Sequence, residues 1–428
     1  MSPAPRSRLL RRALVATLAA LASTAVLAGP ADAAAGRTYV AFGDSYTSGL
    51  GMPEQRRTPA GEPNCFRSAR NYPSQVARRM DLGAERSGGW ADLSCSNATL
   101  QGAALLSPVD LLGEVALAEK AGLIGTRTRF VTFTGGGNDR WDAAGLGLFA
   151  GAIICLNDAG CPASPSPQTF GRPQSVTAAA YVARAKPAID RIRALAPKAK
   201  IALVEYPEVL PPDGPLCRTD QLATTPAAPG AQAYARAATN ALFAAQRAAA
   251  APLGVTYVDT TAATTGHDIC QEARFRWYAR TGDTGADPVH PTVDAHAAIA
   301  KVVYAARPSV PKATLRAPSS VRVGRTATLR TTNLVRASGY RARLTRRMTV
   351  AGRVRTCTAP VGRTKTTSGS AKFSGRVPRT VTCAGAPRAS RVRATPAGRY
   401  TVRVCPESSS GACRSTGSTV TDRVTVRR

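Results

Sequence analysis

The residues Tyr-Val-Ala-Phe-Gly-Asp-Ser-Tyr at positions 39–46 decide how the rest of the chain is interpreted. The first four form a short apolar run typical of a buried strand, and Ser45 follows almost directly. Far downstream the chain reads Asp-Pro-Val-His-Pro at 287–291. Serine is a weak nucleophile until an imidazole takes its proton, and a third group usually orients that imidazole. Ser45, Asp287 and His290 have these chemistries, which predicts a nucleophilic hydrolase.

The hydrophobic pattern predicts an α/β fold. Short runs rich in branched and aromatic residues are typical of buried parallel strands; they lie at 39–42, 129–133, 200–204 and 255–258. Alanine-rich stretches with helical spacing, such as 175–195 and 231–251, lie between them. This alternation predicts a three-layer α/β/α sandwich with a mainly parallel, flavodoxin-like sheet. Active sites of such sheets lie at the carboxyl ends of the strands, where Ser45 and the loop 135–138 are expected.

Residues 1–34 have the pattern of a secretory signal peptide. Four arginines lie within 6–12, residues 13–27 are apolar, and Ala-Asp-Ala at 31–33 is a candidate cleavage site. A transmembrane anchor is the alternative, but the apolar run is short and Pro30 interrupts it. The pattern predicts a secreted, extracellular protein.

Positive charge is concentrated toward the C-terminus. The chain holds 57 lysines and arginines against 26 acidic residues, a net charge of +31. Residues 312–428 contain 26 of the basic residues but only two acidic ones, Glu407 and Asp422, for a net charge of +24. Residues 35–311 have a net charge of only +4. This asymmetry predicts a domain boundary between 35–311 and 312–428.

Residues 312–428 also differ in their hydrophobic period. Apolar and polar residues alternate with a period of two, and turns rich in glycine, serine and threonine separate the runs; examples are 320–323, 326–331, 400–404 and 420–426. This pattern predicts a small all-β domain, resembling an immunoglobulin-like sandwich.

The ten cysteines all follow residue 34, and their even number favours disulfides in an exported chain. No two have C-x-x-C spacing, and the chain has only three histidines. These counts argue against a structural zinc site, and no metal or cofactor is expected.

Four blocks of this sequence resemble those of the SGNH (GDSL-type) hydrolases. They are Gly-Asp-Ser at 43–45, Leu-Ser-Cys-Ser-Asn-Ala-Thr at 93–99, Gly-Gly-Asn-Asp at 136–139 and Asp-Pro-Val-His at 287–290. They occur in the family's order, and the resemblance covers most of 37–310. It implies a catalytic domain at 35–311 that is similar to secreted bacterial lipases and esterases.

The resemblance also implies roles for single residues. Ser45 would be the nucleophile, His290 the general base and acid, and Asp287 the group that orients His290. The backbone N–H groups of Ser45 and Asn97 and the side-chain amide of Asn138 would form the oxyanion hole. Asn97 departs from the family, which has glycine there, but asparagine tolerates a positive φ better than most residues.

Other polar residues near these blocks have alternative interpretations. Asp44 and Asp139 are expected to brace their loops rather than to react. His296 is expected to be a packed or solvent-facing helical residue. His267, beside an aspartate in a loop, is the alternative general base.

Exported members of the family often have three disulfides in the catalytic domain. Sequential pairing of its six cysteines is our expectation: Cys65–Cys95, Cys155–Cys161 and Cys217–Cys270. The four remaining cysteines are expected to pair as Cys357–Cys383 and Cys405–Cys413.

The function predicted from these features is that of a secreted serine carboxylic-ester hydrolase acting on lipid or other acyl esters, as a monomer. Carbohydrate deacetylase and arylesterase are alternatives, because the blocks specify the reaction and not the acyl group. A non-catalytic cell-envelope binding protein on the same scaffold is the alternative from another class. The positive charge of 312–428 has three possible explanations: binding to an anionic cell-envelope or lipid surface, non-specific binding to nucleic acid, or a solvated surface that only keeps the domain soluble. No sequence-specific nucleic-acid binding is expected.

Overall fold

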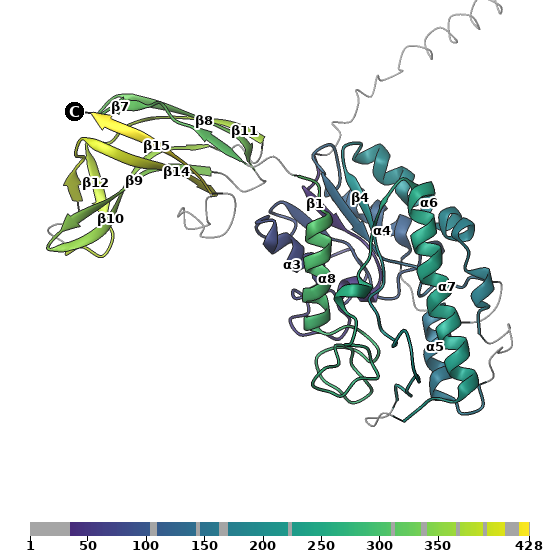
Figure 1. The fold of residues 1–428 in the computed structure, drawn as a ribbon. Helices are drawn as coiled ribbons and strands as arrows, with labels where there is room; N and C mark the ends of the chain where they lie inside the picture. The colour runs from purple at the N-terminus through teal and green to yellow at the C-terminus, as the bar shows by residue number, and fades with distance from the viewer. Residues whose placement is uncertain are drawn as a thin grey trace, which may run out of the picture. The chain divides into compact units, whose positions relative to one another are not determined.

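The structure is a computed structural model that describes residues 35–102, 109–142, 146–161, 170–220, 225–309, 313–334, 340–364, 369–387, 392–406 and 419–427. The expected signal peptide, residues 1–34, lies outside these ranges. Residues 35–309 and 313–427 each have their own hydrophobic core and are described separately (Figure 1). In the described ranges, no helix is long and apolar enough to cross a membrane. The same ranges contain no group of three or more metal-ligating side chains.

Residues 35–309 contain a five-stranded parallel sheet with the strand order β2-β1-β3-β4-β5. Its strands are β1 (Tyr39–Ala41), β2 (Trp90–Asp92), β3 (Phe130–Phe133), β4 (Lys200–Val204) and β5 (Thr256–Val258). The four predicted strands are confirmed, whereas β2 was not predicted. This is the strand order of flavodoxin-like folds, in which ligands bind at the carboxyl edge where the order reverses.

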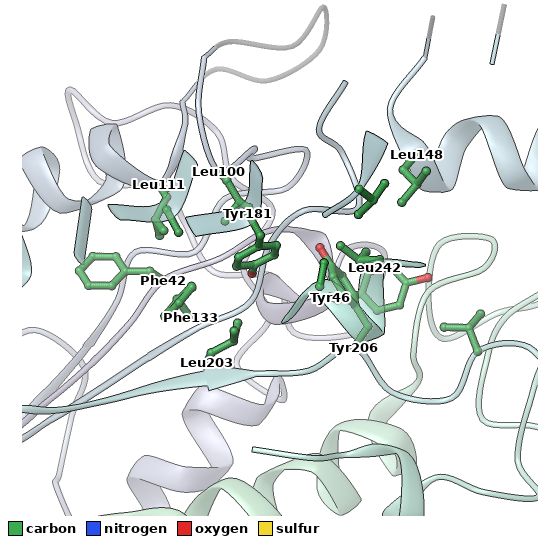
Figure 2. Packing of buried hydrophobic residues seen from close by; sticks show 14 of the residues in the cluster. Phe42, Tyr46, Leu100, Leu111, Phe133, Leu148, Tyr181, Leu203, Tyr206 and Leu242 are labelled. Carbon is green, nitrogen blue, oxygen red and sulfur yellow. The ribbon is translucent and has the colours of Figure 1, made fainter. Parts of the chain in front are cut away.

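Both faces of the sheet are buried, so its strands are apolar without alternation. Side chains of Val40, Val131 and Leu203 belong to one core cluster, which also contains Phe42 and Phe133 (Figure 2). Tyr39, Phe130, Ala202 and Val204 belong to the cluster on the opposite face.

Helices cover each face in a separate layer, which confirms the α/β/α sandwich (Figure 1). One layer contains α4 (Leu111–Lys120), α5 (Leu148–Asn157), α6 (Ala178–Leu195) and α7 (Pro229–Leu253). The other contains α3 (Tyr72–Arg79) and α8 (Val293–Ala306). A one-turn helix, α2 (Ser45–Ser48), and two 3₁₀ turns, η1 (Pro173–Ser175) and η2 (Thr261–Ala263), complete the described helical segments.

The described residues of 313–427 form β strands and turns, as predicted. A mainly antiparallel sheet has the strand order β13-β12-β10-β9-β14-β15-β7, and a second sheet has the order β11-β8-β6. The strands are β6 (Thr314–Arg316), β7 (Ser320–Arg322), β8 (Thr326–Leu334), β9 (Tyr340–Val350), β10 (Arg353–Thr364), β11 (Gly369–Arg376), β12 (Thr380–Cys383), β13 (Val392–Ala394), β14 (Gly398–Pro406) and β15 (Val420–Arg427).

The two sheets share one core. Leu329 and Phe373 from the smaller sheet and Leu344 and Val402 from the larger one lie in the same cluster. Their outward neighbours are polar, which explains the period-two pattern of the sequence. The described strands divide seven to three, whereas a constant immunoglobulin domain divides its strands four to three.

Candidate active site

Ser45 is presented by a tight turn between β1 and α2. Gly43 has a φ of +130°, and a Cβ there would lie 2.6 Å from the carbonyl oxygen of Thr134, so a larger residue would not fit. Asp44 is the N-cap of α2, and its carboxylate accepts a hydrogen bond of 2.9 Å from the backbone N–H of Tyr46. This confirms the expectation that Asp44 braces the turn. Ser45 itself is only 4% exposed.

His290, from the loop before α8, contacts Ser45 directly. Its Nε2 lies 2.8 Å from Ser45 Oγ. Its Nδ1 lies 2.8 Å from the carbonyl oxygen of Pro288, which can only accept, so Nδ1 carries the proton and Nε2 is free to accept from the serine hydroxyl. Burial lowers the pKa of His290, and the Pro288 carbonyl and the charge of Asp287 oppose that shift. The imidazole is therefore neutral near pH 7, as a general base must be.

Asp287 does not occupy the position that we expected for it. The acceptor at Nδ1 of His290 is the carbonyl of Pro288, and Asp287 is exposed. The main chain of Asp287 closes the turn instead: its carbonyl accepts from the N–H of His290 at 3.0 Å, and its N–H donates to the carbonyl of Leu50 at 3.1 Å. This tight turn directs the Pro288 carbonyl toward the ring, and the Asp287 carboxylate acts on His290 only through its charge.

The histidine loop is held in a strained conformation. Val289 has a φ of +67°, which is rare for a β-branched residue. Its carbonyl accepts a hydrogen bond of 2.8 Å from the hydroxyl of Tyr46, the residue after the serine. Its N–H donates to the carbonyl of Ala279 at 2.7 Å, and the N–H of Ala279 donates to the carbonyl of His290 at 3.1 Å. Tyr46 thus joins the serine helix to the histidine loop.

The three expected oxyanion donors lie on segments that are bonded to one another. Asn97 has a φ of +66°, the conformation for which the family uses glycine. The side-chain amide of Asn138 donates one hydrogen bond of 3.0 Å to the carbonyl of Ala98, which leaves its second N–H for another acceptor. The N–H of Cys95 donates to the carbonyl of Gly43 at 2.7 Å, beside the turn that presents Ser45.

Tyr206 is a residue of this site that the sequence interpretation missed. Its hydroxyl accepts a hydrogen bond of 2.9 Å from the N–H of Gly137 and donates to the carboxylate of Asp44. Burial raises the pKa of Asp44 to about 7, against the lowering effect of the hydrogen bonds that it accepts from Tyr206 and from the N–H of Tyr46. Tyr206 therefore connects the cap of the serine helix with the loop of Asn138. Its place two residues after the end of β4, at the carboxyl edge, was a usable signal.

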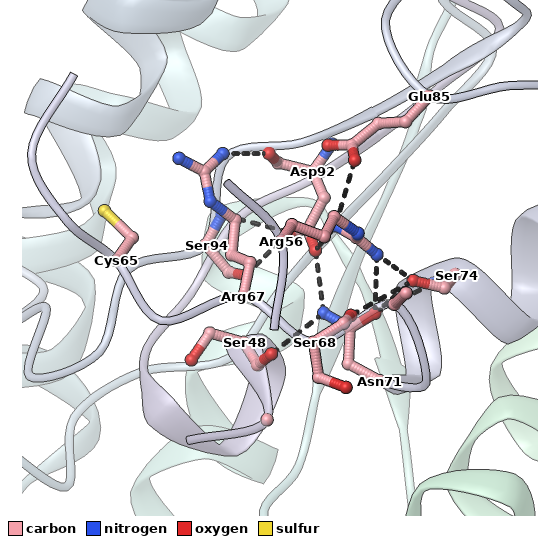
Figure 3. Close-up of polar contacts among 12 residues, drawn as sticks. Ser48, Arg56, Cys65, Arg67, Ser68, Asn71, Ser74, Glu85, Asp92 and Ser94 are labelled. Atoms are coloured by element: carbon pink, nitrogen blue, oxygen red, sulfur yellow. Dashed lines mark hydrogen bonds and ion pairs between the residues drawn. The ribbon is translucent and has the colours of Figure 1, made fainter. Parts of the chain in front are cut away.

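A buried polar network holds the other end of α2 (Figure 3). The side-chain amide of Asn71 donates to the carbonyl of Ser48 at 3.1 Å and to Asp92 at 2.7 Å. Asp92 also accepts from Arg56 at 3.0 Å. The hydroxyls of Ser48 and Ser96 are 2.8 Å apart. The last turn of the serine helix is thus bonded to the end of β2 and to the segment of Asn97.

The remaining candidates are engaged elsewhere. His296 is fully buried; its Nδ1 accepts from the N–H of Tyr72 at 3.0 Å, and burial lowers its pKa to about 3. His267 stacks on Trp277 with 3.5 Å between ring centroids, and its Nδ1 lies 2.6 Å from a backbone carbonyl. Asp139 is buried and accepts hydrogen bonds from a backbone N–H and from a guanidinium, so it holds its loop as expected.

The disulfides of the α/β region join the cysteines in sequential order: Cys65–Cys95, Cys155–Cys161 and Cys217–Cys270. The first anchors the segment of Asn97 to the loop 51–72. In the β region Cys357 pairs with Cys383. Cys405 is disulfide-bonded as well, whereas Cys413, its expected partner, lies outside the described residues.

Comparison with known proteins agrees with this geometry. Residues 41–298, which include every residue of the site, match the GDSL-like Lipase/Acylhydrolase family. The chain belongs to this family. It is therefore an ester hydrolase of the lipase and esterase type.

Two relatives and one solved structure are similar over most of the α/β region. The chain is 33% identical to Lipase 2 of Streptomyces coelicolor over 284 residues, which is 63% of this chain and 87% of the relative. It is 27% identical to an esterase of Streptomyces scabiei over 320 residues, 64% of this chain and 91% of the relative. The crystal structure of phospholipase A1 from Streptomyces albidoflavus NA297 aligns with a TM-score of 0.44 and 23% identity, over 63% of this chain and 98% of that one.

Proposed function

We propose that the protein is a secreted serine carboxylic-ester hydrolase that acts through an acyl-enzyme intermediate. Ser45 is the nucleophile and His290 the general base and acid. The observation that carries the proposal is the pair of contacts made by the imidazole, 2.8 Å to Ser45 Oγ on one side and 2.8 Å to the Pro288 carbonyl on the other. A neutral imidazole fixed in this tautomer can take the serine proton at once.

The reaction then follows from these contacts. Ser45 Oγ attacks the ester carbonyl while its proton passes to Nε2 of His290. The imidazolium gives that proton to the leaving alcohol, and the acyl group stays on Ser45. Water, deprotonated by the same Nε2, attacks the acyl-enzyme. The bond between the acyl carbon and Ser45 Oγ then breaks, the acid is released, and Nε2 returns the proton to Ser45 Oγ. No metal or cofactor is needed in this sequence of steps.

The negative charge of each tetrahedral intermediate would be stabilised by the backbone N–H groups of Ser45 and Asn97 and by the amide of Asn138. These donors are fixed before reaction by the hydrogen bonds of their segments, and preorganised donors are worth about 3–4 kcal/mol each in the transition state. The positive φ of Asn97 supports its assignment, because this conformation is the one that a glycine would adopt there.

Asp287 has a secondary role in this proposal. Its carboxylate is exposed and favours the imidazolium only through space. Water screens such a charge, so its contribution is small. The Pro288 carbonyl does the orienting that an aspartate does in a complete triad.

Acyl esters with an apolar acyl group are the substrates that we favour. Gly147 packs so closely on Asn138 that a Cβ would lie 2.6 Å from the Asn138 carbonyl oxygen, which places residues 146–149 beside the oxyanion loop. Leu146 is 37% exposed there, and Phe149 is partly exposed with its ring 5.9 Å from that of Tyr46. An apolar surface of this kind suits an acyl chain better than a sugar. The relatives named Lipase 2 and Esterase support the same substrate class.

Secretion is part of the proposal and has its own test. The arginine-rich start, the apolar run and the small residues at 31–33 support export, as do the disulfides. Sequencing the N-terminus of protein recovered from the culture medium should give a start near residue 34. Recovery with residues 1–33 still attached would contradict the signal peptide.

The catalytic proposal is tested with p-nitrophenyl esters of increasing chain length. Ser45→Ala and His290→Ala should each lower kcat by about 10,000-fold or more, whereas Asp287→Asn should lower it by less than about tenfold. A preference for medium or long acyl chains supports an esterase that acts on lipids, and a preference for acetate points to a deacetylase.

Two results would overturn parts of this assignment. Wild-type rates from Ser45→Ala would exclude the serine nucleophile. Equal, severe losses from Asp287→Asn and His290→Ala would restore Asp287 as the orienting group. A fluorophosphonate probe that labels the wild type but not Ser45→Ala would locate the nucleophile without depending on the substrate.

A further inference from the structure

The core-facing side of α4 contains a titratable side chain among apolar ones. The buried residues of this helix recur at the spacing of one helical face; they are Leu111, Glu114, Val115 and Ala118. Glu114 is fully buried. Burial of a carboxyl group costs free energy, and an aliphatic side chain would fill the same space without that cost. Packing alone therefore does not explain a glutamate here.

The side chain of Glu114 extends the hydrogen bonding of the sheet into the turn before Ser45. On the side of β1 that faces β2, the N–H of Leu93 donates to the carbonyl of Ala41 at 2.8 Å. Gly43 faces the same side two residues later, where β2 has ended. Its N–H donates to Glu114 Oε2 at 2.8 Å, so a side chain of α4 takes the place of a strand carbonyl.

Both peptide groups of Gly43 are fixed in this way. Its N–H is held by Glu114, and its carbonyl accepts from the N–H of Cys95 at 2.7 Å. The direction in which the chain leaves Gly43 decides where the N–H of Ser45 points two residues later. That N–H is the first of the proposed oxyanion donors, so the carboxyl group of Glu114 acts on it through the backbone.

The start of α4 is also bonded to the segment of the second backbone donor. The N–H of Leu111 donates to the carbonyl of Thr99 at 2.9 Å, two residues after Asn97. Glu114 lies one turn further along the same helix. It therefore connects the turn that presents Ser45 with the segment of Asn97.

The carboxyl group has no second hydrogen-bond partner among the described residues, where its Oε1 is buried and unbonded. Burial raises the pKa of Glu114 well above its ordinary value. The hydrogen bond from Gly43 and the charge of Arg67 oppose this shift, and the charges of Asp92 and Asp44 add to it. Near pH 7 the group is thus a neutral acid, and a glutamine would offer the same acceptor oxygen in nearly the same shape.

We propose that Glu114 is a positioning residue for ester hydrolysis: its buried carboxyl oxygen holds the Gly43 N–H and thereby fixes the oxyanion donor of Ser45. The inference rests on the proposed function, because it assumes the oxyanion hole described there. Glu114 does not touch the substrate, so its effect belongs to stabilisation of the transition state and not to ground-state binding.

Substitutions at position 114 separate the hydrogen bond from the bulk of the side chain. Glu114→Met keeps the length but has no oxygen for the Gly43 N–H. Its kcat on p-nitrophenyl butyrate should fall about 50-fold, which is less than the loss on removing an oxyanion donor, while KM stays within about threefold. Glu114→Gln keeps the acceptor and should keep kcat within about threefold of the wild type.

A third substitution applies if Glu114→Met does not fold. Glu114→Asp keeps the carboxyl group but withdraws it by one methylene from the Gly43 N–H. It should lower kcat about tenfold, again with little change in KM. A wild-type kcat in Glu114→Asp and Glu114→Met would contradict the proposal.

Inhibition by phenylboronic acid gives a readout that does not depend on turnover, because its tetrahedral adduct with Ser45 resembles the transition state. Its Ki should rise in Glu114→Met by about the factor by which kcat falls, and should stay unchanged in Glu114→Gln. A slow Glu114→Met variant that bound the inhibitor as tightly as the wild type would have an intact oxyanion hole, and the proposal would be wrong.

Val115→Ala is the matched control, because Val115 is a fully buried neighbour on the same helix. The change weakens the packing of α4 and keeps the Gly43 hydrogen bond. It should lower Tm and leave kcat within about twofold. Equal losses of kcat in Val115→Ala and Glu114→Met would overturn the proposal, as would a loss in Glu114→Gln as large as in Glu114→Met.

Failure of the proposed function would look different. Wild-type rates from Ser45→Ala would remove the nucleophile, and with it the oxyanion hole on which this inference rests. An inactive Ser45→Ala variant beside fully active Glu114→Met and Glu114→Asp variants would refute the role of Glu114 alone.

Discussion

Arginine is used in opposite ways in the two regions of the molecule. In the α/β region Arg67 is 6% exposed and bonds to Glu62 at 2.9 Å and to the carbonyl of Asp92. Arg56 lies 3.0 Å from the carboxylate of Asp92 (Figure 3). In the β region Arg343 and Arg403 stand opposite each other on the outside of a sheet. The first pattern satisfies charge inside the protein, and the second concentrates it at the surface.

The difference shows what each region requires. Around Asp92 the guanidinium groups connect loops that must keep Ser45 and Asn97 in place, so each charge has a specific partner. On the outer face of the larger β sheet the register instead places like charges side by side, as with Arg343 and Arg403. Net charge alone would not distinguish these two uses.

The largest expected effect tests the internal network. Asp92→Ala removes a fully buried carboxylate that accepts hydrogen bonds from Arg56, Asn71 and Ser94. The donors of these three side chains then lose this acceptor. We expect the free energy of unfolding to fall by about 3–5 kcal/mol. Urea unfolding followed by tryptophan fluorescence measures this region selectively, because the three tryptophans are at 90, 141 and 277.

Arg399→Ala, at an exposed position of β14, is the contrasting substitution. It should change the free energy of unfolding by no more than about 0.5 kcal/mol, which calorimetry measures. If Asp92→Ala cost as little as Arg399→Ala, the internal network would not be needed for the fold.

The next effect is a dependence of stability on pH in the α/β region. His296 is neutral when folded, with a pKa lowered to about 3, whereas an unfolded histidine takes up a proton below about 6.5. Stability from this group is therefore complete above pH 6.5 and is lost as the pH falls. Between pH 7.5 and 5 the wild type should lose about 2 kcal/mol more than His296→Gln. Parallel urea titrations at the two pH values measure the difference, and identical losses would contradict a neutral buried His296.

A smaller effect is expected on catalysis from Tyr206→Phe. The change removes the acceptor of the Gly137 N–H and a donor to Asp44, and both groups are buried. We expect kcat to fall about tenfold, from about 1–2 kcal/mol of lost positioning, while KM stays within about twofold.

Tyr234→Phe is the matched control for this change. Its buried hydroxyl donates to the carbonyl of Gly171 at 2.7 Å, so the change removes a hydrogen bond of the same kind at a different place. It should lower stability by a similar amount and leave kcat unchanged. A tenfold loss of kcat in both variants would mean that Tyr206 acts through general stability rather than through the loop of Asn138.

The smallest effect concerns Arg403 on the outer face of the larger β sheet. Arg403→Thr removes a charge opposite Arg343, so the β region should gain about 0.2–1 kcal/mol at low salt, and the gain should shrink as salt is added. Scanning calorimetry at two salt concentrations measures it. A destabilising effect at low salt would show that Arg403 has a structural partner.

Sequence patterns predicted the strands and helices that are buried on both faces or strongly periodic. The runs at 129–133 and 200–204 became β3 and β4, and the stretch at 231–251 became most of α7. β2 was missed because Trp90–Asp92 is only three residues long and ends in an aspartate, so nothing in its pattern distinguishes it from a loop.

Within the site, the sequence predicted only those residues whose side chains have a characteristic chemistry. Ser45 and His290 were named from their blocks, and the structure brings them into contact. The Pro288 carbonyl could not be named, because every residue has a carbonyl and only the turn decides which one faces the imidazole. Tyr206 was missed for a related reason: its partners Asp44 and Gly137 come from two other strand ends, and no local pattern records that they meet.

The Cys65–Cys95 bond makes the finished active site dependent on where the chain is. Cytoplasmic thiols are kept reduced, so a newly made chain holds the segment of Asn97 without its covalent anchor. In the proposed route of secretion, the anchor closes only after the chain has reached an oxidising environment outside the cytoplasm. A cell that made this enzyme would thus carry it among its own acyl esters in an incompletely assembled form, and oxidation outside the cell would serve as the last step of its maturation.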